Sequence, residues 1–136
     1  MQLLTGVDLI EIARVRHACE RWGERFLTRV YTADELALYR GRWASLAARW
    51  AAKEAVAKLL GVGLRGLSSG GGAQVGLLEI AIVSEPSGRP LLQLSGAAAS
   101  RSQQLALAPI TISLSHTRDL AIAHAVAVQQ PKGALS

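Results

Sequence analysis

The stretch Trp50-Ala51-Ala52-Lys53-Glu54-Ala55-Val56-Ala57-Lys58-Leu59-Leu60-Gly61 decides the fold. Its alanine, leucine, lysine and glutamate residues favour a helix, and a glycine just past the last leucine is a natural helix end. We therefore predict a helix from about Trp43 to Leu60. Because this helix is apolar on nearly every side, it should lie buried in the core.

Glu54 is the residue that fits this helix least well. A carboxylate in an apolar setting is costly unless it pairs with a positive charge or holds a cation. Glu54 and Lys58 are four positions apart and share a helix face, so a structural ion pair is one interpretation. The other interpretation is a functional site, because carboxylates in unfavourable surroundings often, though not always, belong to one.

Composition predicts one folded domain with a sizeable core. The chain has 136 residues, of which half are hydrophobic and only 4% aromatic. We expect residues 1–130 to form the domain and residues 131–136 to be a loose tail. We find no signal peptide and no apolar run long enough to span a membrane, and Cys19 is the only cysteine. These features predict the cytoplasm.

The net charge of +5 predicts an acidic partner. Most of the cations are arginines, which suit the recognition of phosphate and carboxylate groups. Nucleic acid, anionic lipid, an acidic protein and a phosphorylated small molecule all remain possible on charge alone.

Near the N-terminus, residues 2–10 read as a strand that contains Asp8. Asp8 with Glu11 three residues later is also the pattern of a helix capping box. Two carboxylates at the end of an apolar strand equally suit a metal site. Both interpretations stay open at this point.

The next segment, from about Ile10 to Phe26, has helical periodicity. Arg14, Arg21 and Arg25 fall within one narrow stripe of this helix. The stripe is either a solvated face or a docking surface for an acidic partner.

The remaining chain predicts an α+β fold. Thr32 and Glu35 form a capping box for a short helix, and residues 61–76 form a glycine-rich loop. Gly61 and Gly63 at its start could approach a phosphate with bare backbone N–H groups. His116 lies at a strand end, where a structural histidine is the default. The other expected elements are two hairpins and a helix, at residues 77–85 with 91–94, 110–116 with 120–128, and 96–107.

Four motifs in order resemble the holo-acyl-carrier-protein synthases, which are small 4′-phosphopantetheinyl transferases. The motifs are Gly6-Val7-Asp8-Leu9-Ile10-Glu11-Ile12, Phe26-x-x-Arg29-x-Tyr31-Thr32-x-x-Glu35, Trp50-Ala51-x-Lys53-Glu54-Ala55-x-x-Lys58 with Gly61, and Ser113-Leu114-Ser115-His116-Thr117. The resemblance implies an α+β domain with a small antiparallel sheet wrapped around a long buried helix. It also implies a homotrimer with active sites between subunits.

The resemblance implies transfer of 4′-phosphopantetheine from coenzyme A to a serine of apo acyl carrier protein, in fatty acid or polyketide biosynthesis. The other product would be adenosine 3′,5′-bisphosphate. By the family pattern, Asp8 and Glu54 would hold Mg²⁺ at the coenzyme pyrophosphate, and Lys58 would act with them in catalysis. Glu11 would either interact with the residues that hold the metal or act through a metal-bound water.

The family pattern also assigns binding residues. Lys58, Gly61, Gly63 and His116 would contact coenzyme A. Arg14, Arg21 and Arg25 would dock the acidic carrier protein. No nucleic acid or membrane is implied.

One departure is Val62, which replaces a threonine that the family usually has between the two glycines. This change keeps open the alternative of a family member that binds carrier protein without catalysis. A second alternative is a basic module that binds nucleic acid through the arginine stripe, which would leave Asp8 and Glu54 unexplained.

Overall fold

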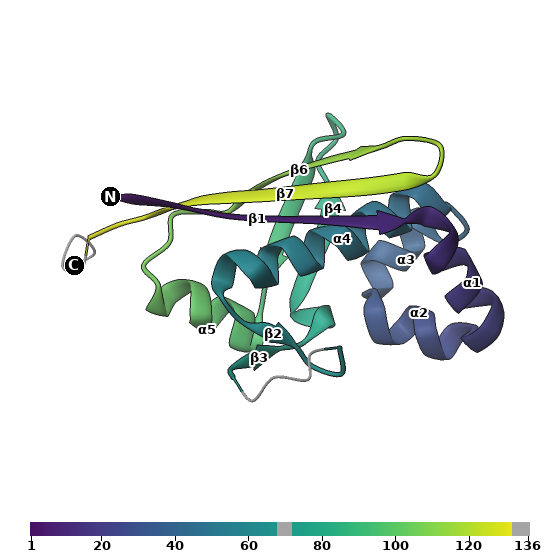
Figure 1. Ribbon diagram of the computed structural model, residues 1–136, viewed down its shortest axis with the longest axis horizontal. Helices are drawn as coiled ribbons and strands as arrows, with labels where there is room; N and C mark the ends of the chain where they lie inside the picture. Colours follow the sequence, from purple (N-terminus) through teal and green to yellow (C-terminus); the bar gives the residue numbers. More distant parts are fainter. Residues whose placement is uncertain (68–71, 132–136) are drawn as a thin grey trace.

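The computed structural model describes residues 1–67 and 72–131 (Figure 1). Its helices and strands, in chain order, are β1 (Gln2–Glu11), α1 (Ile12–Trp22), α2 (Glu24–Val30), α3 (Ala33–Tyr39), α4 (Trp43–Leu60), β2 (Gly63–Leu64), β3 (Gln74–Val75), the 3₁₀ turn η1 (Leu77–Glu79), β4 (Ile80–Ser84), β5 (Pro90–Leu94), α5 (Gly96–Gln104), β6 (Thr111–His116) and β7 (Leu120–Gln129). The predicted helix 43–60 is confirmed to the residue. Gly61 ends it in the left-handed conformation, with φ of 69°.

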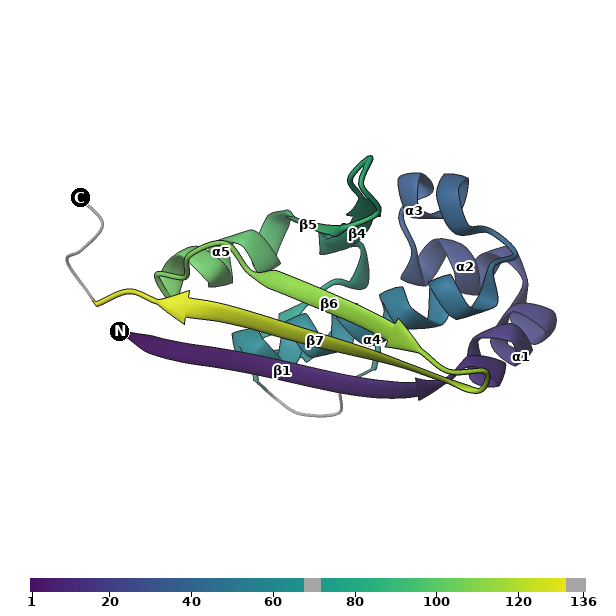
Figure 2. The same ribbon diagram turned by 90° about the horizontal axis from the view of Figure 1, so that it is seen from above.

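A three-stranded antiparallel sheet in the order β1-β7-β6 lies along α4 (Figures 1 and 2). The β4–β5 hairpin forms a separate small sheet that packs against α4 and lies next to β6, and α1, α2 and α3 gather at one end of the molecule. The predicted α+β fold, a small antiparallel sheet around a long buried helix, is thus confirmed.

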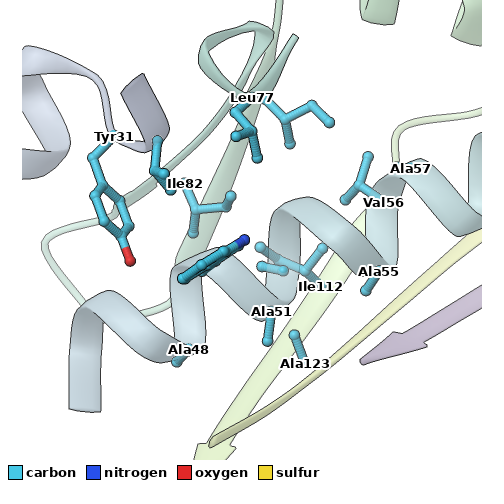
Figure 3. Close-up of a cluster of buried hydrophobic side chains, with 14 of the residues drawn as sticks. Tyr31, Ala48, Ala51, Ala55, Val56, Ala57, Leu77, Ile82, Ile112 and Ala123 are labelled. Atoms are coloured by element: carbon cyan, nitrogen blue, oxygen red, sulfur yellow. The ribbon is translucent and has the colours of Figure 1, made fainter. Parts of the chain in front are cut away.

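Small side chains let the sheet lie close to α4. Alternate residues of β7 are buried alanines, including Ala121, Ala123 and Ala125, and they face an alanine-rich side of α4. Figure 3 shows Ala51 and Ala55 of the helix beside Ala123 of the strand. Larger residues at these positions would force the layers apart, because protein cores are close-packed.

A buried ion pair fixes α4 on the side away from this sheet. Lys53 and Glu35 are both fully buried, and Lys53 Nζ donates to Glu35 Oε1 at 2.7 Å and to the Leu77 carbonyl at 3.0 Å. Glu35 Oε2 accepts from the Ile82 N–H at 2.9 Å. Burial lowers the pKa of Lys53, and the charge of Glu35 opposes that shift. These bonds set the rotation of α4 about its axis.

Glu35 also completes the predicted capping box with Thr32, which is confirmed. Its second role could not be read from the local pattern, because Lys53 and Ile82 lie far along the chain.

Several local expectations were wrong. The helix expected over residues 10–26 is two helices, because Gly23 takes a φ of 58° and separates α1 from α2. The capping interpretation of Asp8 fails as well, since Asp8 lies inside β1 and the Glu11 side chain makes no cap bond. The strand expected from residue 77 begins with the 3₁₀ turn, and the helix expected over 96–107 ends at Gln104.

The glycine-rich segment 61–76 is not simply a loop. Its two ends pair as the short parallel strands β2 and β3, while residues 68–71 lie outside the described residues. The expected tail 131–136 also lies almost wholly outside them. Within the described residues, we find no helix that is both long and apolar enough to cross a membrane.

Candidate active site

The candidate site forms where β1 crosses α4, and Gly6 makes this crossing possible. A Cβ atom at position 6 would lie 1.9 Å from the Ala55 carbonyl oxygen and 2.9 Å from the Leu59 nitrogen. Only glycine lets the strand backbone come so close to the helix backbone. Gly6, Asp8 and Ile10 share one face of β1, because side chains alternate along a strand.

Asp8 and Lys58 join the two elements directly. Lys58 Nζ donates to Asp8 Oδ1 at 3.0 Å and to the Val7 carbonyl at 2.9 Å. Asp8 has 17% of its side chain exposed and Lys58 has 55%, so the pair opens to solvent at the lysine. The ion pair suggested between Glu54 and Lys58 is replaced by this longer-range pair.

Glu54 lies beside Asp8 as a second, half-buried carboxylate. Burial and the negative charge of Asp8 raise the pKa of Glu54. Lys58 and Arg14 act in the opposite direction without cancelling the shift. The ionised form of Glu54 therefore has too little positive charge around it, which is the condition that a bound cation corrects.

Two carboxylates with one lysine suit a site for Mg²⁺. Mg²⁺ typically takes one or two protein carboxylates and completes its coordination with water and substrate phosphates. Among residues 1–67 and 72–131 we find no cluster of three or more histidine, cysteine, aspartate or glutamate side chains able to hold a metal. A site built wholly from protein ligands, as zinc or calcium often requires, is therefore not formed by these residues.

Residues 5–125 match the family model of the 4′-phosphopantetheinyl transferase superfamily. The holo-[acyl-carrier-protein] synthase of Chloroflexus aurantiacus is 51% identical over 133 residues, covering 92% of this chain and 97% of that protein. The synthase of Herpetosiphon aurantiacus is also 51% identical, over 91% of this chain and 97% of its own. The Helicobacter pylori synthase, solved in complex with coenzyme A, superposes with a TM-score of 0.76 at 29% identity and covers 92% of this chain and 100% of that one.

The chain belongs to the holo-[acyl-carrier-protein] synthases. It is therefore a phosphopantetheinyl transferase, and the predicted family and enzyme class are confirmed. The predicted reaction, transfer of phosphopantetheine from coenzyme A to apo acyl carrier protein, is the reaction of this class. The alternative of a basic module that binds nucleic acid is not supported, because the chain belongs to the synthase family.

The structure of this synthase does not bring Glu11 to the Asp8–Glu54 pair. Glu11 ends β1 on the strand face opposite Asp8, and it lines an outer hollow with Arg14 and His17. His116 lies on the edge strand β6, two strands away from Asp8, and its Nδ1 contacts the Thr117 carbonyl at 3.1 Å. Coenzyme contact by His116 stays a prediction.

The turn after α4 offers fewer phosphate donors than expected. The N–H groups of Gly61, Val62 and Gly63 already donate to carbonyl oxygens, at 3.1, 3.0 and 3.0 Å. The expectation of bare N–H groups is therefore wrong, and any contact of Gly61 or Gly63 with coenzyme A must rest on close approach alone. The first two partners are carbonyls in the last turn of α4, whereas the partner of Gly63, the Ala73 carbonyl, is brought close only by the pairing of β2 and β3.

The three predicted docking arginines of the synthase do not form one helical stripe. Arg14 and Arg21 lie on α1, whereas Arg25 follows the break at Gly23 and lies on α2. Arg14 packs over the Trp50 ring at 5.5 Å, and its charge acts on Glu54. Arg14 is thus close to the candidate metal-binding carboxylates, as a pure docking residue would not be.

Sequence reasoning missed Arg49. Arg49 is only 7% exposed, and it lines a cleft of about 560 Å³ between α3, α4 and the β4–β5 hairpin. Its guanidinium donates to Ser84 Oγ and to the Ser45 carbonyl, both at 3.2 Å, while Nε has no partner. The guanidinium lies 3.6 Å from the centroid of the Tyr39 ring, and the described residues include no salt bridge to Arg49. The sequence feature that could have pointed to Arg49 is its position as a charged residue within the mostly apolar helix α4.

Proposed function

We propose that this synthase transfers 4′-phosphopantetheine with Mg²⁺ held by Asp8 and Glu54, in fatty acid biosynthesis in the cytoplasm. The observation that carries the metal assignment is the half-buried Glu54 beside Asp8, whose own carboxylate is bonded to Lys58. The cytoplasmic location stays a prediction.

The chain's own residues would act mainly by positioning and by neutralising charge, as phosphoryl transfer requires. Mg²⁺, when bound, would stabilise negative charge on the pyrophosphate of coenzyme A. Lys58 is held by hydrogen bonds to Asp8 and to the Val7 carbonyl, so its ammonium group lies beside the proposed metal site, where it would neutralise charge on the leaving group. Asp8, which is fixed on strand β1, would hold both Mg²⁺ and the Lys58 ammonium group in place.

The acidic carrier protein would dock on α1 and α2. Arg21 and Arg25 are exposed there, and Trp22 between them is 54% exposed, with the Arg21 guanidinium 4.9 Å from its ring centroid. Exposed tryptophan and arginine are typical anchors of protein interfaces. Charged residues of this kind act chiefly on association rate and on its salt dependence.

The outer face of the main sheet supports the predicted homotrimer. Leu3, Val7 and Leu9 of β1 are 66%, 51% and 58% exposed, and Ile122 of β7 is 39% exposed. Since β1 pairs with β7 in register, these side chains lie on one largely apolar face that also carries Thr5 and His124. An exposed apolar patch of this kind is characteristic of a protein interface.

The Arg49 cleft supports an active site shared between subunits. A buried arginine without a carboxylate partner suits a phosphate, which coenzyme A can provide. Arg49 and Glu54 are five residues apart on α4, which places them about 140° apart around the helix. Arg49 faces Ser84 and Glu54 faces Asp8, so one chain does not turn both toward a single ligand. We infer that the second residue comes from a neighbouring copy.

Mixed oligomers test this arrangement. Arg49→Gln and Glu54→Gln should each be nearly inactive at low coenzyme A concentration, since each removes one half of every site. Co-expression in equal amounts should restore about a quarter of wild-type activity, because random pairing completes one site in four. Activity no higher than the mean of the two parents would place the whole site in one chain and remove the shared-site proposal.

The reaction itself is tested by the mass of an apo acyl carrier protein. Incubation with the synthase, coenzyme A and Mg²⁺ should add one phosphopantetheine to the carrier, and chelator should prevent the gain. A gain that persists in chelator would remove the metal from the proposal. No gain with a folded enzyme and several carrier proteins would favour a non-catalytic carrier-binding role.

A further inference from the structure

A cleft of about 710 Å³ lies beside the proposed docking surface, between α1, α2 and residues 65–67. Its floor is apolar and includes Phe26, Trp50 and Leu77. Its rim carries Arg25 and Arg29 of α2 and Arg65 from the opposite side, and none of the described residues that line it is acidic. An apolar floor with a cationic rim is complementary to an apolar side chain on an acidic surface.

Arg65 belongs to the glycine-rich segment, yet it has a fixed partner. Arg65 Nη2 donates to Glu79 Oε1 at 2.9 Å, while 55% of the arginine side chain remains exposed. Glu79 also accepts hydrogen bonds from the backbone N–H groups of Gly76 and Ala97. One carboxylate therefore ties the segment after α4 to η1 and to the first turn of α5.

The surroundings of Glu79 are built to hold this carboxylate in one place. Gly96 has a φ of 53°, and a Cβ atom there would lie 2.1 Å from Glu79 Oε2. Burial opposes ionisation, but the hydrogen bonds from Gly76 and Ala97 and the charge of Arg65 lower the pKa of Glu79. The anion is thus stable at neutral pH and is a permanent anchor for Arg65.

We propose that Arg65, held in place by Glu79, is a specificity-determining residue for the carrier protein, closing the cationic rim of the cleft opposite α2. The occupant is an apolar side chain of the acidic carrier surface that docks on α1 and α2. This inference rests on the proposed function. It adds a carrier contact outside the helices. Arg25 and Arg29 belong to α2, whereas Arg65 belongs to the segment after α4.

Arg65→Ala tests the assignment by its effect on individual kinetic constants. The KM for apo carrier protein should rise about five- to tenfold, while kcat and the KM for coenzyme A stay within twofold, since a rim charge acts on association. The dependence of kcat/KM on salt should become weaker. Arg21→Ala serves as the positive reference on α1. Arg89→Ala, at an exposed turn outside the cleft, is the matched control and should change none of these constants.

A double-substitution cycle separates positioning from a structural role of Glu79. Glu79→Gln should raise the carrier KM in the wild-type background and have no further effect on it in the Arg65→Ala background. Thermal stability should fall in both backgrounds, because Glu79 also accepts two backbone bonds. If Glu79→Gln raises the carrier KM by the same factor in both backgrounds, Glu79 has a structural role and does not act through Arg65.

The outcomes for the two proposals are distinct. If wild-type enzyme fails to modify any carrier protein, the proposed function fails. If wild-type enzyme is active and Arg65→Ala behaves like Arg89→Ala, only the role of Arg65 is overturned.

Discussion

Glu54→Gln should abolish transfer while leaving the fold intact. The amide keeps the size of the side chain but removes one of the two negative charges that attract Mg²⁺. Losing a metal's stabilisation of the transition state removes several kcal/mol, so kcat/KM should fall by about 10²- to 10³-fold. Steady-state kinetics with apo carrier protein measures this effect. Glu24→Gln, a surface carboxylate that pairs with Arg40, is the matched control and should retain activity.

The pH dependence of the stability of Glu54→Gln tests whether the Glu54 carboxylate destabilises the folded protein when no metal is bound. Burial and Asp8 raise the pKa of Glu54 above its unfolded value, so the folded state binds this proton more tightly. Stability from Glu54 is therefore present at low pH and is lost as the pH rises through the folded pKa. Without metal, Glu54→Gln should be more stable than wild type at neutral pH, and the gap should close in acid. Equal stability at both pH values would show that Glu54 is unstrained.

Gly6→Ala should damage both stability and activity. The new methyl group would lie 1.9 Å from the Ala55 carbonyl oxygen, so β1 must move away from α4. Forcing extra atoms into a packed interior costs about 1–3 kcal/mol and occasionally more. The movement also draws Asp8 away from Glu54 and Lys58, so activity should fall well beyond what the loss of folded protein explains.

Denaturant unfolding and kinetics on the folded fraction measure the two effects of Gly6→Ala separately. Gly72→Ala is the control, because a Cβ atom there meets nothing within 4 Å. Wild-type activity in Gly6→Ala would mean that the crossing of β1 and α4 is not what positions Asp8.

The sequence was most informative where local preferences and the fold agree. Helix α4 was predicted to the residue because strong helix formers end at Gly61, and the Thr32–Glu35 box was predicted because capping is a local pattern. The helix break at Gly23 was missed, since a single glycine can also be accommodated within a helix.

Long-range partners lay beyond the sequence pattern. Lys58 was considered as a partner of Glu54 four residues away, but it bonds to Asp8, fifty positions along the chain. That pairing depends on the close approach at Gly6, which no periodicity reveals. The surroundings of Arg49 and of Glu79 likewise become visible only when β4 and α5 pack beside α4 and η1.

The central claim is that Asp8 and Glu54 hold a metal that coenzyme A needs for tight binding. Calorimetric titration of coenzyme A into the enzyme, with and without Mg²⁺, tests it most directly because no chemistry is involved. We predict that Mg²⁺ tightens coenzyme binding by about tenfold or more in wild type, equivalent to about 1.4 kcal/mol, and not in Glu54→Gln. The same Mg²⁺ dependence in both proteins would contradict the account.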